Sequence, residues 1–209
     1  MTTMFSNPRI LKRFIILMAV ATFVMFSIWA VVRMAKEDIP GDYEVRQGDI
    51  FLQDKLYEKA LARFEEALKQ EPDHRGAIGG KAAALISLER YQEAETVLTY
   101  LIDFLTRTLP DDDPTGTGAL SAAYGNRGII KDRQGRYEEA LKDYIKSINI
   151  DAEIADGPSW VDYLLYHNRK PSSVLTRAEY IYKQLQLPES ERLMRVPELD
   201  ETQRMYKPR

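Results

Sequence analysis

Apolar positions follow two patterns along the chain: a continuous run near the start and a helical spacing afterwards. The run FIILMAVATFVMFSIWAVV, residues 14–32, contains no charged side chain over about nineteen positions, enough for a long apolar helix. Later stretches such as GRYEEALKDYIKSI, residues 135–148, place apolar and small residues at intervals of three and four. One face of that helix consists of Tyr137, Ala140, Tyr144 and Ser147. These patterns predict an all-α chain.

The amphipathic pattern repeats. KLYEKALARFEEAL (55–68) and ERYQEAETVLTYLI (89–102) resemble the stretch at 135–148, and each of the three has a tyrosine three residues before an alanine. From Ala60 to Ala94 is about 34 residues, and from Ala94 to Ala140 is that distance plus about twelve. The spacing predicts three units of one repeat, with an insertion before the third.

Each of these helices follows another that has a small residue about twelve positions before the alanine. Two antiparallel helices approach to about 8 Å only where both faces lack bulk at the crossing. Glycine or alanine opposite alanine provides that clearance, so we expect six positions to hold the helix pairs together. They are Gly48, Ala60, Ala82, Ala94, Gly128 and Ala140.

On these residues the chain resembles a tetratricopeptide-repeat (TPR) protein. The first unit also matches the family's large and helix-ending residues at Phe51, Phe64 and Pro72, and the third matches at Tyr124 and Tyr144. The second unit is looser, with Ile78, Leu85 and Leu98 at the large positions. An unrelated helical bundle is the alternative, but a bundle has no reason to keep the 34-residue period. The resemblance implies an α-solenoid of stacked helix pairs.

The expected organisation has one membrane segment and one repeat region. It comprises a cytoplasmic segment (1–13), a transmembrane helix (14–33), a linker (34–41), repeat one (42–74), repeat two (75–108), an insertion loop (109–118), repeat three (119–153), a degenerate repeat or capping helices (158–188) and a tail (189–209). Asp42 is expected to cap the first repeat helix. The last apolar face is expected to be covered by Trp160, Tyr163, Leu164 and Leu175. The tail is charged and broken by proline, so disorder is expected, with wrapping back or binding of a partner as the alternatives.

The apolar run has two other interpretations. A cleaved signal peptide needs a shorter apolar stretch and small residues at its exit, whereas this run leaves through Trp29, Val32 and Arg33. A core helix that is apolar on all sides needs more surrounding apolar surface than the polar repeats provide. A single membrane span is therefore the prediction.

Charge predicts which side the repeats occupy. Arg9, Lys12 and Arg13 precede the run, which favours a cytoplasmic amino terminus and a repeat region in the periplasm of a bacterial inner membrane. Five of the 29 basic residues and none of the 32 acidic ones precede residue 37, so the remainder carries 24 basic against 32 acidic residues, a balance of -8. An acidic surface binds nucleic acid poorly, because phosphate binding needs clustered Lys and Arg.

Little in the sequence indicates catalysis or metal binding. The chain has no cysteine, and its two histidines, His74 and His167, stand alone at expected helix ends or turns. GAIGGKA (76–82) lacks the spacer and the Ser or Thr of a phosphate loop. DDDPTG (111–116) has Ala122 where a calcium loop needs glutamate. We therefore expect no enzyme, cofactor, metal or small-molecule substrate.

The TPR resemblance implies a concave groove lined by the first helix of each pair. The groove positions carried onto this chain are Val45, Asp49, Leu52, Gln53, Gly79, Ala83, Ile86, Gly125, Ile129, Asp132 and Arg133. Ile86 and Ile129 are alternatively core residues between repeats. The family's carboxylate-clamp variety has Lys and Asn early in the first repeat, where this chain has Val45 and Asp49, so charged peptide ends are disfavoured. A small, apolar groove suits an apolar or helical protein segment.

Two functions fit this organisation. The first is a membrane-anchored scaffold or adaptor that assists assembly, maturation or secretion of a membrane or periplasmic complex. The second is a permanent accessory subunit of a larger membrane complex. Stoichiometric purification with one complex distinguishes the second from the first.

Overall fold

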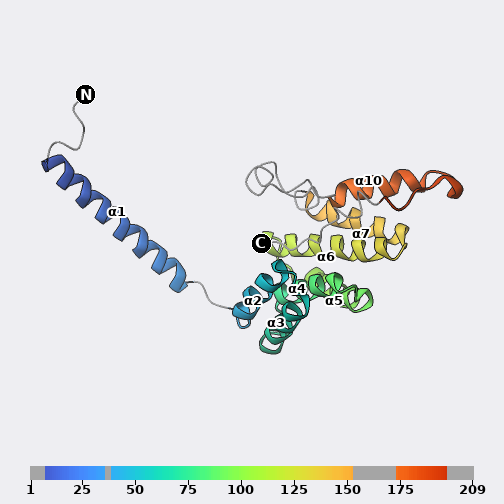
Figure 1. Ribbon diagram of the computed structural model, residues 1–209, viewed down its shortest axis with the longest axis horizontal. Coiled ribbons are helices and arrows are strands. Elements are labelled where there is room, and N and C mark those ends of the chain that lie inside the picture. Colours follow the sequence, from blue (N-terminus) through green and yellow to red (C-terminus); the bar gives the residue numbers. More distant parts are fainter. Residues whose placement is uncertain (1–7, 36–38, 153–172, 197–209) are drawn as a thin grey trace, which may run out of the picture. The chain divides into compact units, whose positions relative to one another are not determined.

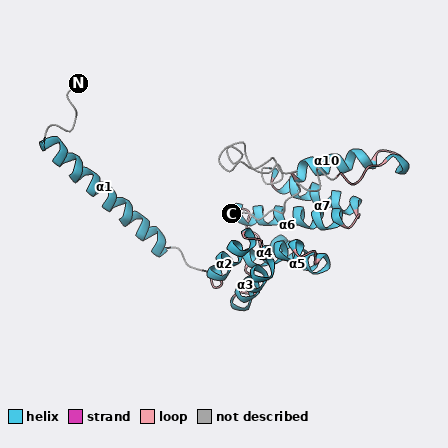
Figure 2. Ribbon diagram, in the orientation of Figure 1, coloured by secondary structure: helices cyan, strands magenta, loops and turns pink. Residues whose placement is uncertain are grey.

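The computed structural model describes residues 8–35, 39–152 and 173–196. Within these ranges it contains eight α-helices and one short 3-10 helix and no strand (Figures 1 and 2). The chain divides into two units, residues 1–39 and residues 40–209, which are described separately below. The all-α prediction is confirmed for the described part of the chain.

The first unit contains one helix, α1 (Pro8–Ala35). Its segment Pro8–Val31 has 24 residues and contains an 18-residue stretch with a mean hydropathy of 2.5, none of which is buried in the structure. At 1.5 Å per residue that segment is about 36 Å long, more than the hydrocarbon core of a bilayer. Length and composition therefore fit a membrane span, and a helix at this place in a chain fits a signal sequence as well.

The second unit begins with three helix pairs, shown in Figure 1. Their bounds are α2 (Asp42–Gln53) and α3 (Tyr57–Gln70), α4 (Arg75–Ser87) and α5 (Tyr91–Thr108), and α6 (Pro114–Arg133) and α7 (Tyr137–Ile150). Each helix packs on the next along the chain, and the first helices also pack on one another, α2 on α4 and α4 on α6. The first helices therefore form one continuous row.

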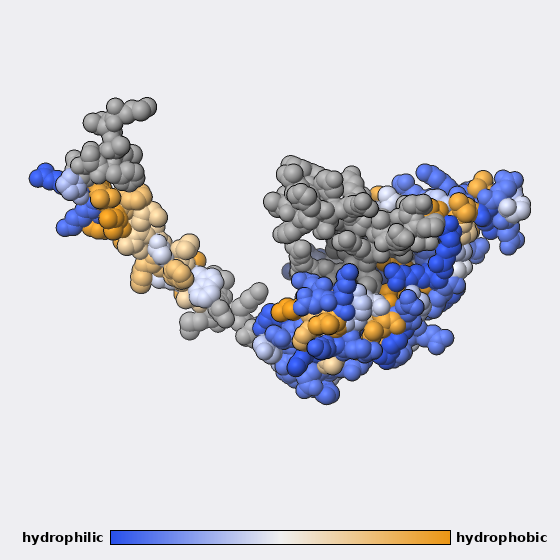
Figure 3. All heavy atoms as spheres, viewed as in Figure 1, coloured by the Kyte–Doolittle hydropathy of each residue, from blue (hydrophilic) through white to orange (hydrophobic). Residues whose placement is uncertain are grey.

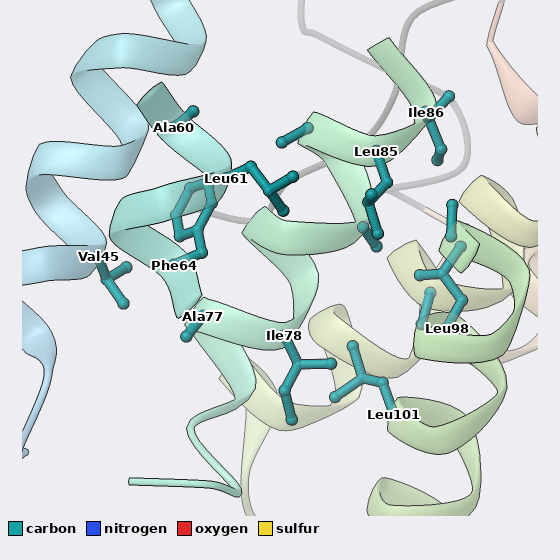
Figure 4. Close-up of a cluster of buried hydrophobic side chains, with 14 of the residues drawn as sticks. Val45, Ala60, Leu61, Phe64, Ala77, Ile78, Leu85, Ile86, Leu98 and Leu101 are labelled. Atoms are coloured by element: carbon teal, nitrogen blue, oxygen red, sulfur yellow. The ribbon is translucent and has the colours of Figure 1, made fainter. Parts of the chain in front are cut away.

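Apolar side chains from the first two pairs and from α6 form one core cluster. Figure 4 shows Leu61 and Phe64 of α3 pointing toward α4, and Ile78 of α4 beside Leu101 of α5. A second cluster joins α6 and α7 to α10 (Val174–Leu185) through residues such as Ile129, Tyr144 and Ile181. Continuous packing from pair to pair is how a solenoid buries surface that one pair alone leaves open.

Small residues lie where the helices of a pair cross. A Cβ atom on Gly128 would lie 2.6 Å from the ring of Tyr144, and one on Gly48 would lie 2.6 Å from the ring of Phe64. These rings stand four residues after Ala140 and Ala60. The glycines therefore make room for an aromatic ring as well as for an alanine. Repeat two has Ala82 with the smaller Leu98 at the same positions, and all six of the small residues expected at crossings are buried.

The turn within each pair has a residue with positive φ at the same repeat position. These residues are Lys55 (φ 60°), Glu89 (φ 59°) and Gly135 (φ 78°). A side chain in the left-handed region costs roughly 1–2 kcal/mol, whereas glycine adopts that region freely. Repeats one and two therefore have a strained turn that repeat three avoids.

Glu89→Gly is expected to stabilise the protein by about 1 kcal/mol, because glycine relieves the left-handed strain of this exposed turn. Urea unfolding of the full chain in mild detergent, followed by far-UV circular dichroism, measures the change. Glu89→Ala is the control, since alanine removes the same carboxylate but keeps a Cβ atom. Equal stability of the two variants would show that backbone strain is not the cause.

One boundary differs from expectation. Helix α6 begins at Pro114 rather than near residue 119, so half of the predicted insertion loop 109–118 is helical. Asp113 caps α6 by accepting a 2.8 Å hydrogen bond from the Gly116 amide, and it pairs with Arg75. The Arg75 hydrogen bond, followed by that of Gly116, lowers the pKa of Asp113. Asp113 therefore joins two repeats, which is a structural role in the segment that resembled part of a calcium loop.

The predicted cap at Asp42 is also corrected. Gly41 precedes α2 with φ 92°, and a Cβ atom there would lie 2.9 Å from the Ala67 carbonyl oxygen, so only glycine fits. The Asp42 carboxylate instead lies 3.1 Å from His74 Nε2. His74 is buried and caps α4 by accepting a hydrogen bond from the Ala77 amide. The Asp42–His74 contact therefore joins the first two repeats.

Beyond repeat three the structure describes α10, the 3-10 helix Glu189–Glu191 and residues up to 196. Helix α10 packs on α7 and covers the end of the second core cluster. Leu175 lies partly buried in it, whereas Trp160, Tyr163, Leu164 and His167 lie outside the described residues. Part of the tail wraps back: Met194 packs against this cluster, and the Tyr180 hydroxyl donates a 2.6 Å hydrogen bond to the Leu193 carbonyl.

Candidate partner-binding surface

The row of first helices is the surface that the sequence assigned to a partner. In α2, Val45 is buried, Asp49 and Leu52 are half-buried, and Gln53 is exposed. In α4, Gly79 is half-buried, and a Cβ atom built on it would meet nothing within 4 Å. Gly79 thus marks open space beside α4.

Two predicted groove residues of α4 are buried instead. Ala83 is 2% exposed and Ile86 is fully buried, and Ile86 belongs to the first core cluster. The alternative interpretation of Ile86 as a core residue therefore fits the structure. Its side chain stabilises the repeats and is not available to a partner.

The part of the row in repeat three is covered by α10. A Cβ atom on Gly125 would lie 3.2 Å from Val174 Cγ2, and Ile129 packs in the cluster that contains Ile181. Arg177 donates hydrogen bonds of 2.7 and 2.8 Å to the two carboxylate oxygens of Asp132, which also accepts one from Tyr144. The expectation of a free groove at Gly125, Ile129 and Asp132 is thus corrected, because a later helix occupies that place.

The tail covers the end of the same row. Arg195 donates a 2.6 Å hydrogen bond to the carbonyl oxygen of Arg133, the last residue of α6. Arg177 also donates to the Met194 carbonyl at 3.0 Å. Arg133 keeps a partly exposed side chain, but its backbone is engaged by the tail.

The ion pair between Asp132 and Arg177 was missed by the sequence analysis. Both side chains are less than 5% exposed, and they lie 45 residues apart in the sequence. One signal was available: Arg177 lies on the apolar face of its helix with Val174, Ala178 and Ile181. A cation at that spacing indicates a buried anionic partner, because an isolated buried charge is very costly.

A second polar cluster joins repeats two and three. Asp143 accepts two hydrogen bonds of 2.8 Å from Arg127 and one of 2.7 Å from Lys131, while Arg127 also donates to Thr99 at 3.2 Å. The hydrogen bonds to Asp143 raise the pKa of Arg127. These hydrogen bonds connect α5, α6 and α7 through Thr99, Arg127 and Asp143, so the cluster is structural.

After these contacts, the part of the first-helix row that the described residues leave accessible lies in repeats one and two. We call it the groove face and define it by Asp49, Leu52, Gln53 and Gly79. Figure 3 shows small apolar patches among hydrophilic residues over the visible part of the second unit. Among the residues that the structure describes, no group of three or more His, Asp or Glu side chains could hold a metal ion.

Comparison with known proteins identifies the type of repeat. Profiles described as tetratricopeptide repeat match residues 51–103 and 121–154. The first match holds α3, α4 and most of α5, and the second holds most of α6 and all of α7. The chain contains tetratricopeptide repeats. These matches agree with the 34-residue period and with the paired helices.

One curated relative is the DnaJ homolog subfamily C member 7 homolog of Dictyostelium discoideum. It is 30% identical over 112 residues, which is 52% of this chain and 19% of the relative. The match with this chain thus spans about a fifth of the length of that relative.

Two solved structures share the TPR fold. The first TPR of Spaghetti (RPAP3) bound to the HSP90 peptide SRMEEVD has a TM-score of 0.50 and 16% identity, covering 71% of this chain and 94% of the other. The first TPR domain of human RPAP3 has the same TM-score and identity, covering 70% and 93%. At this identity the likeness extends to the fold of the TPR unit.

Proposed function

We propose that the protein is a membrane-anchored TPR scaffold that binds a segment of a partner protein on its groove face. The observation that carries this proposal is the open space beside α4 at Gly79. Elsewhere in the row of first helices, core packing buries part of α4, and α10 and the tail cover α6. TPR units are interaction scaffolds, and the groove face offers shape and polar groups rather than a catalytic arrangement.

The chemistry of the groove face favours an apolar or helical segment. Leu52 and the bare backbone at Gly79 provide apolar contact, and Asp49 and Gln53 provide a polar margin. The first TPR of Spaghetti (RPAP3) is bound to the HSP90 peptide SRMEEVD, which contains three acidic residues. In this chain Val45 and Asp49 stand where the clamp variety has a cation and an amide, so the groups that would bind an acidic peptide end are missing at these positions.

The proposed anchor is α1, retained as a membrane span. Its uncharged run of about nineteen residues (14–32) is longer than a signal peptide's apolar region, and basic residues precede that run, which favours repeats on the non-cytoplasmic side. Alkaline extraction of membranes, combined with mass determination of the mature chain, tests the anchor. Retention of the intact amino terminus in the membrane pellet supports it, and a soluble chain beginning after residue 33 contradicts it.

Gly79→Gln is expected to reduce recovery of the partner at least tenfold, because a long polar side chain fills the open space beside α4. Recovery is measured by purifying the tagged full chain from native membranes and quantifying the co-purified protein. Gly79→Ala is the matched control: it keeps the space nearly open and raises helix stability by about 0.5–1 kcal/mol.

Stability separates binding from folding in this comparison. Both variants should keep wild-type helicity and unfold no more easily than the wild type. Loss of partner from Gly79→Gln together with loss of helicity would mean that position 79 serves packing. A partner recovered in a fixed one-to-one ratio would identify a permanent accessory subunit rather than a transient assembly factor.

A further inference from the structure

The leading side of α2 differs from the same side of α4 and α6. Repeat spacing places Tyr43, Arg46 and Ile50 of α2 at the positions of Ala77, Gly80 and Ala84 in α4, and of Ala123, Asn126 and Ile130 in α6. The residues of α4 and α6 at these positions are all buried. In α2, Tyr43 is 61% exposed, Ile50 is 51% exposed, and Arg46 is also exposed. We call these three residues the leading face.

The reason for burial in α4 is the preceding helix pair. A Cβ atom on Gly80 would lie 2.3 Å from the Phe64 ring of α3, so this side of α4 fits directly against the previous repeat. Helix α2 begins the series of pairs and has no described pair before it. Its leading face also has bulky side chains where α4 has Ala, Gly and Ala, so it is not shaped for the close approach of another repeat.

Chain length restricts what can lie next to this face. Helix α1 ends at Ala35 and α2 begins at Asp42, a separation of seven residues in the sequence. At about 3.3–3.6 Å per residue, this length of chain spans at most about 25 Å. With α1 in a bilayer, the leading face is confined near the membrane surface at an effective concentration in the mM range.

The chemistry of the face matches the membrane interface. Tyrosine places a ring among lipid tails and a hydroxyl among headgroups, arginine extends its charge toward water from an apolar stem, and isoleucine is apolar. Ile39, just before α2, adds a third exposed apolar side chain. The rest of the chain after residue 36 has a balance of -8, so attraction to anionic lipid does not contribute.

We propose that Tyr43, Arg46 and Ile50 lie in the headgroup region of the bilayer and hold the repeat unit at the membrane surface. This inference rests on the proposed function in one respect, because it requires α1 to span the membrane. It fixes which end of the solenoid meets lipid and leaves the groove face on α2 and α4 open to a partner.

The absence of cysteine from the chain allows a direct test. Single cysteines at positions 43 and 50 carry an environment-sensitive fluorophore in the full chain, reconstituted in phosphatidylcholine vesicles. Ile145 of α7, which is 45% exposed, is the matched control site, and Val20 of α1 reports on the anchor. The vesicles contain lipids brominated along their acyl chains, so that quenchers reach fluorophores in the hydrocarbon core as well as those about 5–10 Å into the interface.

If the inference holds, fluorophores at positions 43, 50 and 20 lose fluorescence in the brominated vesicles, whereas a fluorophore at position 145 keeps its full fluorescence. Quenching at position 20, with positions 43 and 50 behaving like 145, would overturn the inference and leave the anchor intact. No quenching at position 20 would refute the anchor itself, and the inference with it. Shielding of positions 43 and 50 without lipid quenching, accompanied by disulfide crosslinks between two copies, would show that the face joins subunits instead.

Discussion

Ala140→Asp is expected to destabilise the protein by at least about 4 kcal/mol and to unfold the third helix pair. Ala140 is fully buried, and its carbonyl oxygen lies 3.3 Å from the place of a Cβ atom on Gly128, so α6 and α7 are close together there. A carboxylate at this position would lose its hydration without gaining a cation. Urea unfolding of the full chain in mild detergent, followed by far-UV circular dichroism, measures the loss.

Ala62→Asp is the matched control for this experiment. Ala62 lies within α3 and is exposed, so the same substitution there costs only the difference in helix propensity, roughly 0.5 kcal/mol. Ala140→Asp should therefore destabilise the protein far more than Ala62→Asp. A similar loss in both would mean that Ala140 does not lie at a helix crossing.

Asp132→Ala is expected to cost about 3–5 kcal/mol, because it leaves the buried guanidinium of Arg177 without its carboxylate. Arg177 is 2% exposed and joins α10 and the tail to α6. Loss of the hydrogen bonds between Arg177 and Asp132 should let α10 separate from α6 and α7 before the other helices unfold. Hydrogen exchange of the α10 amides measures this local opening directly.

The double variant Asp132→Ala/Arg177→Met separates the ion pair from general packing. Methionine keeps much of the apolar contact of Arg177 without its charge, so the double variant should be more stable than Asp132→Ala alone. A double variant less stable than Asp132→Ala would contradict the view that an uncompensated charge causes the loss. Greater protection of α10 in the double variant is the expected accompanying result.

The repeats could be predicted from the sequence because their determinants are local. Tyrosine and alanine at fixed spacing, with a small residue about twelve positions earlier, specify two helices and their crossing without any knowledge of the rest of the chain. Residues such as Gly48 and Gly128 are buried at these crossings. The positive φ of Lys55 and Glu89 could not be predicted from the sequence, since neither residue is a glycine.

The start of α6 was misplaced although its signal was present. Asp113 followed by Pro114 is a capping residue before a proline at the first helical position, a common helix start. The glycines at 116 and 118 suggested a loop instead, because glycine in a helix is locally unfavourable. The structure places both of them in buried positions of α6, where packing outweighs local preference.

The extent of the binding surface could not be predicted from the repeats alone. Gly125, Ile129 and Asp132 occupy groove positions of repeat three, but α10 reaches them from about 45 residues further along the chain. A contact of that sequence separation depends on tertiary packing, which no local pattern determines. The groove face is therefore shorter than the repeats imply and is centred on repeats one and two.

The most direct test of the proposed partner binding uses a photo-crosslinking amino acid at Gln53, which is exposed on the groove face. Irradiation of native membranes that contain the full chain should give one discrete protein adduct. The same probe in the Gly79→Gln variant should give none, although the variant remains folded. An adduct that persists unchanged in that variant, or that also forms from a probe at Ile145 on α7, would contradict binding at this face.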